Sequence, residues 1–191
     1  MSFQSLLLVG KHPELTPGLM ESFPPESGIS CVTVEQPDSL DLHLKNDLPD
    51  LVLLFTDVIK TWELTAESFC QHLYELTPEY RSILIVYAPE ADEAERIQWL
   101  QAGADDVFSN EMSTAELRAR VLAHLRRNLE FLCHPQTHLP GLPLVAKSLQ
   151  RCLRRGDEWA LLVIEVDSFT VYSEIYGDIP SSQVRLAVGL S

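Results

Sequence analysis

The chain has 191 residues, of which 46% are hydrophobic and 22% charged, and its formal net charge at pH 7 is −14. That apolar content is enough for a folded core and excludes a globally disordered chain. The acidic balance argues against nucleic acid as a partner, because a phosphate backbone would be repelled over most of the surface. Most of the excess lies in residues 1–133, which carry 9 Lys+Arg against 22 Asp+Glu.

The sequence contains no sign of a membrane segment or of a disulfide framework. The first apolar run, Leu6–Val9, lacks a basic region before it and is too short for a signal peptide. No stretch approaches the roughly 20 apolar residues that cross a bilayer. The scattered cysteines predict reduced thiols, and the spacing of Cys133, His134, His138 and Cys152 does not fit a zinc site. We therefore expect a cytoplasmic protein with no membrane partner, metal or cofactor.

The first 133 residues alternate between short aliphatic runs and segments of helical period. The aliphatic runs predict five strands: Leu6–Val9, Ser30–Val34, Leu51–Phe55, Ile83–Tyr87 and Asp106–Phe108. Between them, the apolar spacing favours helices near residues 14–23, 38–46, 65–77 and 92–102. This alternation is typical of an α/β fold, here a five-stranded doubly wound parallel sheet.

A long helix is predicted after the fifth strand. Ser113 and Glu116 fit a capping box at its start. Apolar residues then recur at spacings of four and three along one stripe: Leu117, Val121, Leu125, Leu129 and Leu132. A helix that projects from its domain and is still apolar on one face usually packs against a partner helix. Dimerisation through this stripe is our hypothesis, and a monomer whose helix folds back on the following residues is the alternative.

The pattern restarts after Cys133. A connector rich in Pro and Gly precedes a helix at Leu144–Arg155, a strongly apolar strand at Trp159–Val166 and helices at Phe169–Tyr176 and Gln183–Leu190. A single strand leaves its backbone edges unpaired. The second segment therefore has the elements of an incomplete α/β domain.

Four motifs of the first segment, in order and at family spacing, resemble the receiver domain of two-component response regulators. They are Val9–Glu14 (VGKHPE) for the family's VDDxPE start, Pro49–Leu54 (PDLVLL) for its third strand, Gly103–Phe108 (GADDVF) for its GADDY turn and Glu116–Val121 (ELRARV) for the eLxxRV pattern of its last helix. The resemblance covers about residues 5–127. It implies a flavodoxin-like sheet with the strand order 2-1-3-4-5.

The phosphorylation chemistry of that family does not carry over to this chain. Gly10 and Lys11 occupy the places of the acidic pair that binds Mg²⁺, and Phe55 occupies that of the phospho-acceptor aspartate. Tyr87 occupies the position of the switch Thr/Ser, and Asn110 occupies that of the Lys that pairs with the phosphoryl group. The resemblance thus implies a pseudo-receiver that cannot be phosphorylated.

Two residues near these positions suggest other chemistry. Asp57 lies two residues beyond the acceptor position, a shift that keeps the strand face but moves the carboxylate by about 7 Å, so we expect it to cap a loop. His12 lies beside Lys11, and together they would make the former acidic pocket mildly cationic and able to hold a small anion. A pair of surface side chains without a ligand is the commoner explanation.

The second segment resembles the beginning of a GGDEF (diguanylate cyclase) domain. The matching motifs are His134–Pro140 (HPQTHLP) for the opening DPLTGLP, Glu165–Phe169 (EVDSF) for DxDxF and Tyr176–Asp178 (YGD) for YGH. The match spans residues 134–191, about a third of such a domain. The signature hairpin of the family would lie beyond Ser191.

The active positions of that family are also altered. The resemblance implies Glu165 as a residual metal ligand, because a carboxylate oxygen suits Mg²⁺. Thr170 stands where the family has its phosphate-facing Lys, and Ser173 and Ser182 stand where it has the Asn and Asp that read the nucleotide. We therefore expect no cyclase activity.

These observations predict a pseudo-receiver at residues 1–127, a helix extension and connector at 128–141 and a truncated GGDEF-like segment at 142–191. The expected function is that of a bacterial two-component-type signalling protein, not an enzyme. Its receiver would act as a module for protein interaction and homodimerisation. The alternatives are the regulatory part of a longer diguanylate cyclase-like protein and a pseudo-receiver whose altered pocket binds a small molecule or anion.

Overall fold

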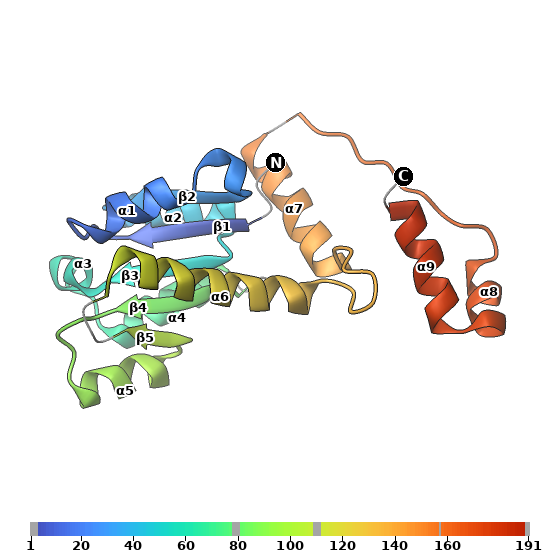
Figure 1. The fold of residues 1–191 in the computed structure, drawn as a ribbon. Coiled ribbons are helices and arrows are strands. Elements are labelled where there is room, and N and C mark those ends of the chain that lie inside the picture. Colours follow the sequence, from blue (N-terminus) through green and yellow to red (C-terminus); the bar gives the residue numbers. More distant parts are fainter. Residues whose placement is uncertain (1–3, 78–80, 109–111, 157, 190–191) are drawn as a thin grey trace. The chain divides into compact units, whose positions relative to one another are not determined.

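The structure is a computed structural model that describes residues 4–77, 81–108, 112–156 and 158–189. The chain divides into two compact units, Met1–Leu125 and Arg126–Ser191. Figure 1 shows the order of the elements along the chain.

A five-stranded parallel sheet forms the centre of the first unit. Its strands are β1 (Gln4–Val9), β2 (Ile29–Val34), β3 (Leu51–Phe55), β4 (Ile83–Tyr87) and β5 (Asp106–Phe108), in the order β2-β1-β3-β4-β5. All five residues of β3 are buried, as expected for a central strand that is covered on both faces. The predicted strands and the order 2-1-3-4-5 are confirmed.

Helices cover both faces of this sheet (Figure 1). On one face, α1 (Leu15–Ser22) and α6 (Thr114–Leu132) pack against Leu6, Leu8 and Leu53. On the other, α2 (Pro37–Asp47), α4 (Ala66–Leu76) and α5 (Glu93–Ala102) supply buried side chains that pack with the alternate residues of the same strands. The alternation of side chains along each strand thus divides the core into two layers.

Two short helices in this unit were not predicted. The third strand was predicted to end at Phe55 with no helix before residue 65, but α3 (Thr56–Thr61) follows β3 directly. A second, 3₁₀ turn, η1 (Pro25–Ser27), precedes β2. Both helices are shorter than two turns, so neither can show the apolar period on which the predictions relied.

Three residues of the predicted dimer stripe belong to the core instead. Leu117, Val121 and Leu125 on α6 are at most 1% exposed and pack within the first unit. Their side chains are therefore unavailable to a second chain, and the prediction that they form a dimer face is wrong. Leu129 and Leu132, farther along the same helix, are only partly buried.

The second unit is helical, which corrects the prediction of a partial α/β segment. It contains the end of α6 and the helices α7 (Leu142–Arg155), α8 (Phe169–Tyr176) and α9 (Asp178–Gly189). The strand predicted at Trp159–Val166 is absent, and these described residues have no regular structure. The apolar run is that of a strand, but a strand forms only where another strand hydrogen-bonds to it. The last helix begins at Asp178, five residues before the predicted start.

Candidate functional site

The candidate site is a cleft of about 870 Å³ at the carboxyl ends of β1, β3 and β4. Its walls come from the segments that follow these strands and from α5, and they include His12, Asp57, Pro89 and Trp99. In this strand order, β1 and β3 are the neighbours between which the direction of winding reverses. The crevice outside the carboxyl ends of the strands at such a switch point is where α/β proteins bind ligands.

Three rings form an aromatic cluster on the floor of this cleft: His12, Phe55 and Tyr87. The ring centroids of His12 lie 6.0 Å from Phe55 and 5.6 Å from Tyr87, and those of Phe55 and Tyr87 lie 5.7 Å apart. Phe55 is 2% exposed and Tyr87 is 3% exposed. These are favourable tilted and edge-to-face contacts. The cluster therefore joins the ends of β3 and β4 to the segment after β1.

His12 also positions the start of α1. Its Nδ1 atom accepts hydrogen bonds from the backbone N–H groups of Glu14 at 3.4 Å and Leu15 at 3.3 Å. The N-cap side chain of α1, Glu14, makes no such bond. The imidazole thus supplies the acceptor that the first turn of a helix requires.

Neither of the two positions at which the receiver family has its acidic pair, Gly10 and Lys11, offers a carboxylate. Gly10 has φ +89°, a conformation that side chains rarely adopt, and a Cβ there would lie 3.0 Å from Cβ of Val58. Lys11 is exposed, and its Nζ lies 3.7 Å from Oε1 of Glu35. Lys11 is not among the residues that line the cleft, so it does not contribute to the cationic pocket that was the less favoured interpretation of the Lys11–His12 pair.

The remaining predicted positions differ in how far the structure describes them. Tyr87 lies at the end of β4 and lines the cleft, while Asn110 lies outside the described residues. Asp57 is exposed in the first turn of α3, where it also lines the cleft. Asp57 was expected to cap a loop, but the backbone turns into α3 directly after Phe55, so this carboxylate lies in the first turn of a helix.

The walls of the cleft are predominantly acidic. Four carboxylates line it, those of Glu14, Asp57, Glu90 and Glu95, against one lysine, Lys60. This balance disfavours an anion as ligand. Glu90 and Glu95 were not predicted to belong to the site. Their signal was their position after β4, since Glu90 lies in the connection that follows this strand and Glu95 in the first turn of α5, both at the carboxyl edge of the sheet.

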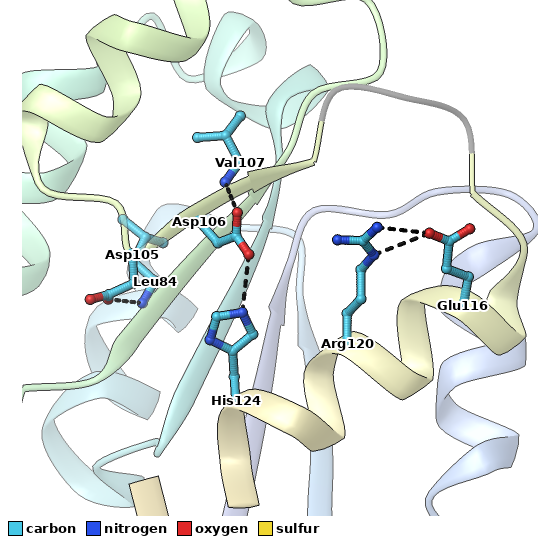
Figure 2. A network of polar contacts seen from close by, with 7 residues as sticks. All are labelled: Leu84, Asp105, Asp106, Val107, Glu116, Arg120 and His124. Carbon is cyan, nitrogen blue, oxygen red and sulfur yellow. Dashed lines mark hydrogen bonds and ion pairs between the residues drawn. The ribbon is translucent and has the colours of Figure 1, made fainter. Parts of the chain in front are cut away.

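A polar network links β5 to α6, as Figure 2 shows. Nε2 of His124 lies 3.1 Å from Oδ2 of Asp106, whose other oxygen accepts a hydrogen bond from the N–H of Val107 at 2.9 Å. Arg120 lies one turn before His124 on α6 and donates two hydrogen bonds, at 3.0 and 3.1 Å, to Glu116, which lies one turn earlier still. The His124–Asp106 contact thus connects α6 to β5, while the Arg120–Glu116 ion pair lies within α6.

The capping box predicted at the start of α6 is only half confirmed. The N–H of Glu116 donates to Oγ of Ser113 at 3.2 Å, as predicted. The carboxylate of Glu116 pairs with Arg120. An ion pair at i, i+4 is thus the observed contact of this side chain.

The GGDEF-related positions are spread over the second unit. Glu165 lies exposed between α7 and α8, Thr170 is exposed on α8, and Oγ of Ser173 donates to the carbonyl of Phe169. Ser182 on α9 is buried and its hydroxyl donates to Oε1 of Gln136. The contacts of Ser173 and Ser182 are with a residue of α8 and a residue of the connector.

The described part of the chain contains neither a membrane-spanning helix nor a cluster of metal-ligating side chains. No helix there is long and apolar enough to span a bilayer. Nor does any group of three or more His, Cys, Asp or Glu side chains in those residues have the arrangement of a metal site. Cys133, His134, His138 and Cys152 therefore form no such group.

The sheet order, the covering helices and the cleft define the first unit as a domain with the response-regulator receiver fold, over about 65% of the chain. The phosphate regulon transcriptional regulatory protein PhoB of Rhizobium meliloti (strain 1021) is 34% identical over 103 residues, which are 52% of this chain and 43% of that protein. The chain thus spans less than half the length of this relative. No protein-family profile matches the chain.

Solved structures show the same fold. The crystal structure of HP1043, an orphan response regulator of H. pylori, has a TM-score of 0.54 and 21% identity, and the match covers 65% of this chain and 98% of that one. The solution structure of the beryllofluoride-activated NtrC4 receiver domain dimer has a TM-score of 0.52 and 15% identity, with coverages of 65% and 98%. At these identities the similarity concerns the fold alone.

Proposed function

We propose that the first unit is a pseudo-receiver that takes part in bacterial two-component-type signalling by binding proteins, without being phosphorylated. The observation that carries this proposal is Phe55 at the end of β3. The receiver family has its acceptor aspartate at this position, whereas the Phe55 ring is 2% exposed and packed against His12 and Tyr87. A phenyl ring offers no nucleophile.

The neighbouring positions support the same proposal. Mg²⁺ requires oxygen ligands, and Gly10 and Lys11 supply none from their side chains. In an ordinary receiver the phosphoryl group shifts an equilibrium between two states. Without that ligand, the aromatic cluster holds the ends of β1, β3 and β4 in one arrangement. The surface formed by β5 and α6 then presents its charges to a partner constitutively.

Exposure to a small phosphodonor tests this proposal. The full chain is incubated with acetyl phosphate and Mg²⁺ and its intact mass is measured, with a phosphorylatable receiver as positive control. We expect no mass increase. Addition of one phosphoryl group would overturn the proposal, and Asp57→Asn would show whether that exposed carboxylate in the cleft is the acceptor.

Homodimerisation through α6 is part of the proposed function, now limited to the end of the helix. Leu129 and Leu132 are partly buried, and Phe131 is 88% exposed. The match to a receiver dimer is consistent with association of such domains. Substitution of Leu129 and Leu132 by Glu is expected to weaken a dimer measured by light scattering, whereas an unchanged mass would exclude this helix as the contact.

We further propose that the second unit is the start of a degenerate GGDEF-like domain without cyclase activity. Its three sequence motifs support this origin, and Ser173 and Ser182 support the loss of nucleotide recognition. Incubation with GTP and Mg²⁺ is expected to yield no cyclic dinucleotide and no rise in melting temperature. Either product formation or stabilisation by GTP would contradict the proposal.

A further inference from the structure

The side chain of His12 caps the turn that leads into α1. Its Nδ1 atom accepts hydrogen bonds from the N–H groups of Glu14 and Leu15, at 3.4 and 3.3 Å. The backbone of His12 takes part in the same turn, since its N–H donates to Oγ1 of Thr16 at 2.8 Å and its carbonyl accepts from the N–H of Thr16 at 3.1 Å. Side chains that cap a helix bond in this way to the N–H groups two and three residues on.

This cap requires a neutral imidazole. Both ring nitrogens of a protonated histidine are donors, so a protonated Nδ1 would face two N–H groups without accepting from either. The positive charge would also lie at the amino end of a helix, where the helix dipole disfavours a cation. Protonation of His12 therefore removes the cap. Histidine is the side chain that ordinarily changes its charge between pH 5 and pH 8.

The charges around His12 attract the protonated ring toward the cleft. Among the described residues that line the cleft with His12, the carboxylates come from the turn before α1, from α3, from the connection after β4 and from α5: Glu14, Asp57, Glu90 and Glu95. Lys60 on α3 supplies an ammonium group there, and Tyr87 on β4 a phenol. Lys11, the neighbour of His12 in the chain, lies with its Nζ 3.7 Å from Oε1 of Glu35. The acidic balance of the cleft thus favours the imidazolium.

We propose that His12 is a proton switch of the cleft. The neutral ring caps α1 and completes the aromatic cluster, with its centroid 6.0 Å from that of Phe55 and 5.6 Å from that of Tyr87. The protonated ring leaves the cap and turns toward the carboxylates of the cleft, which frees the first turn of α1. Above the pH of this change, the cluster keeps the single arrangement described under the proposed function.

The contact between α1 and α6 gives the switch a route to the rest of the first unit. A Cβ on Gly18 of α1 would lie only 2.6 Å from Cγ2 of Thr114, the first residue of α6. Leu15 and Leu19 of α1 belong to the same buried cluster as Leu117 of α6. A shift of α1 therefore reaches the helix that carries the proposed partner surface, a consequence that rests on the proposed function.

NMR of the labelled full chain between pH 8 and pH 5 tests the switch. At pH 8 the imidazole ¹⁵N signals of His12 are expected to show a proton on Nε2 and none on Nδ1. As the ring protonates, the protection of the Leu15 amide against solvent exchange is expected to fall about fivefold, as for the loss of one helix cap. His12→Asn keeps a capping oxygen that does not titrate, so its Leu15 protection should stay constant. The matched control His43→Asn, on α2, should retain the native change at Leu15.

Three results would overturn this inference: a neutral ring with its proton on Nδ1, a Leu15 amide whose protection is constant while the ring protonates, or an equal loss of protection in His12→Asn. The first two are measured on the native chain and do not depend on the folding of a variant. The phosphodonor experiment measures a different property, so failure of the switch and failure of the pseudo-receiver proposal are distinguishable.

Discussion

Replacement of Phe55 by Ala tests the aromatic cluster directly. A buried Phe→Ala change costs about 3–5 kcal/mol of unfolding free energy, and each lost aromatic pair contributes about 0.5–1.5 kcal/mol beyond burial. Phe55 is 2% exposed and makes two ring contacts, but it borders an open cleft into which water can enter. We therefore expect a loss near the lower limit, about 3 kcal/mol.

Urea unfolding measures this loss. A Trp159→Phe background leaves Trp62 and Trp99, both in the first unit, as the fluorescent reporters. The matched control is Phe131→Ala, whose ring is 88% exposed and whose loss is expected to cost less than about 0.5 kcal/mol. A cost below about 1 kcal/mol for Phe55→Ala would refute the reasoning, since it would mean that the ring is not packed as described.

Three further changes test other parts of the structure. Gly10→Ala is expected to cost about 1–3 kcal/mol in urea unfolding because of its φ of +89°, and a neutral result would contradict the described backbone. Burial raises the pKa of Cys31 to about 12 and that of Cys70 to about 11, from 9.0. Because the folded state holds these protons more tightly, the contribution of the neutral thiols to the free energy of unfolding is fully present below pH 9. It is lost as the pH rises through 11–12, and Cys31→Val should diminish this fall. His124→Ala removes a partly exposed contact with Asp106 and is expected to cost less than about 1 kcal/mol by thermal melting, so a larger loss would mean a deeper role.

The sheet could be predicted from the sequence because its strands are short aliphatic runs buried on both faces. Leu51–Phe55 is the clearest case, since every residue in it is buried. The strand order came from the resemblance in motif spacing, and the order observed agrees with it. The positions of Phe55 and Tyr87 at the carboxyl ends of their strands followed from the same pattern.

Features that depend on tertiary contacts could not be predicted from the sequence pattern. The run at Trp159–Val166 has the composition of a buried strand, but its conformation depends on a partner strand that the pattern cannot supply. The stripe on α6 has one period throughout, so the sequence could not show that Leu125 is buried in the core while Leu129 is only partly buried. The acidic character of the cleft arises from separate loops and helices, which only the fold brings together.

The most direct test of the pseudo-receiver proposal is a ¹H–¹⁵N spectrum of the full chain, recorded with and without Mg²⁺ and beryllofluoride. That anion mimics a phosphoryl group only where an acceptor carboxylate and a bound metal ion hold it. We expect the amide signals of His12, Asp57 and Ala88 around the cleft to stay in place at all concentrations. Saturable shifts of these signals would contradict the proposal and would show that the cleft retains a phosphorylation site.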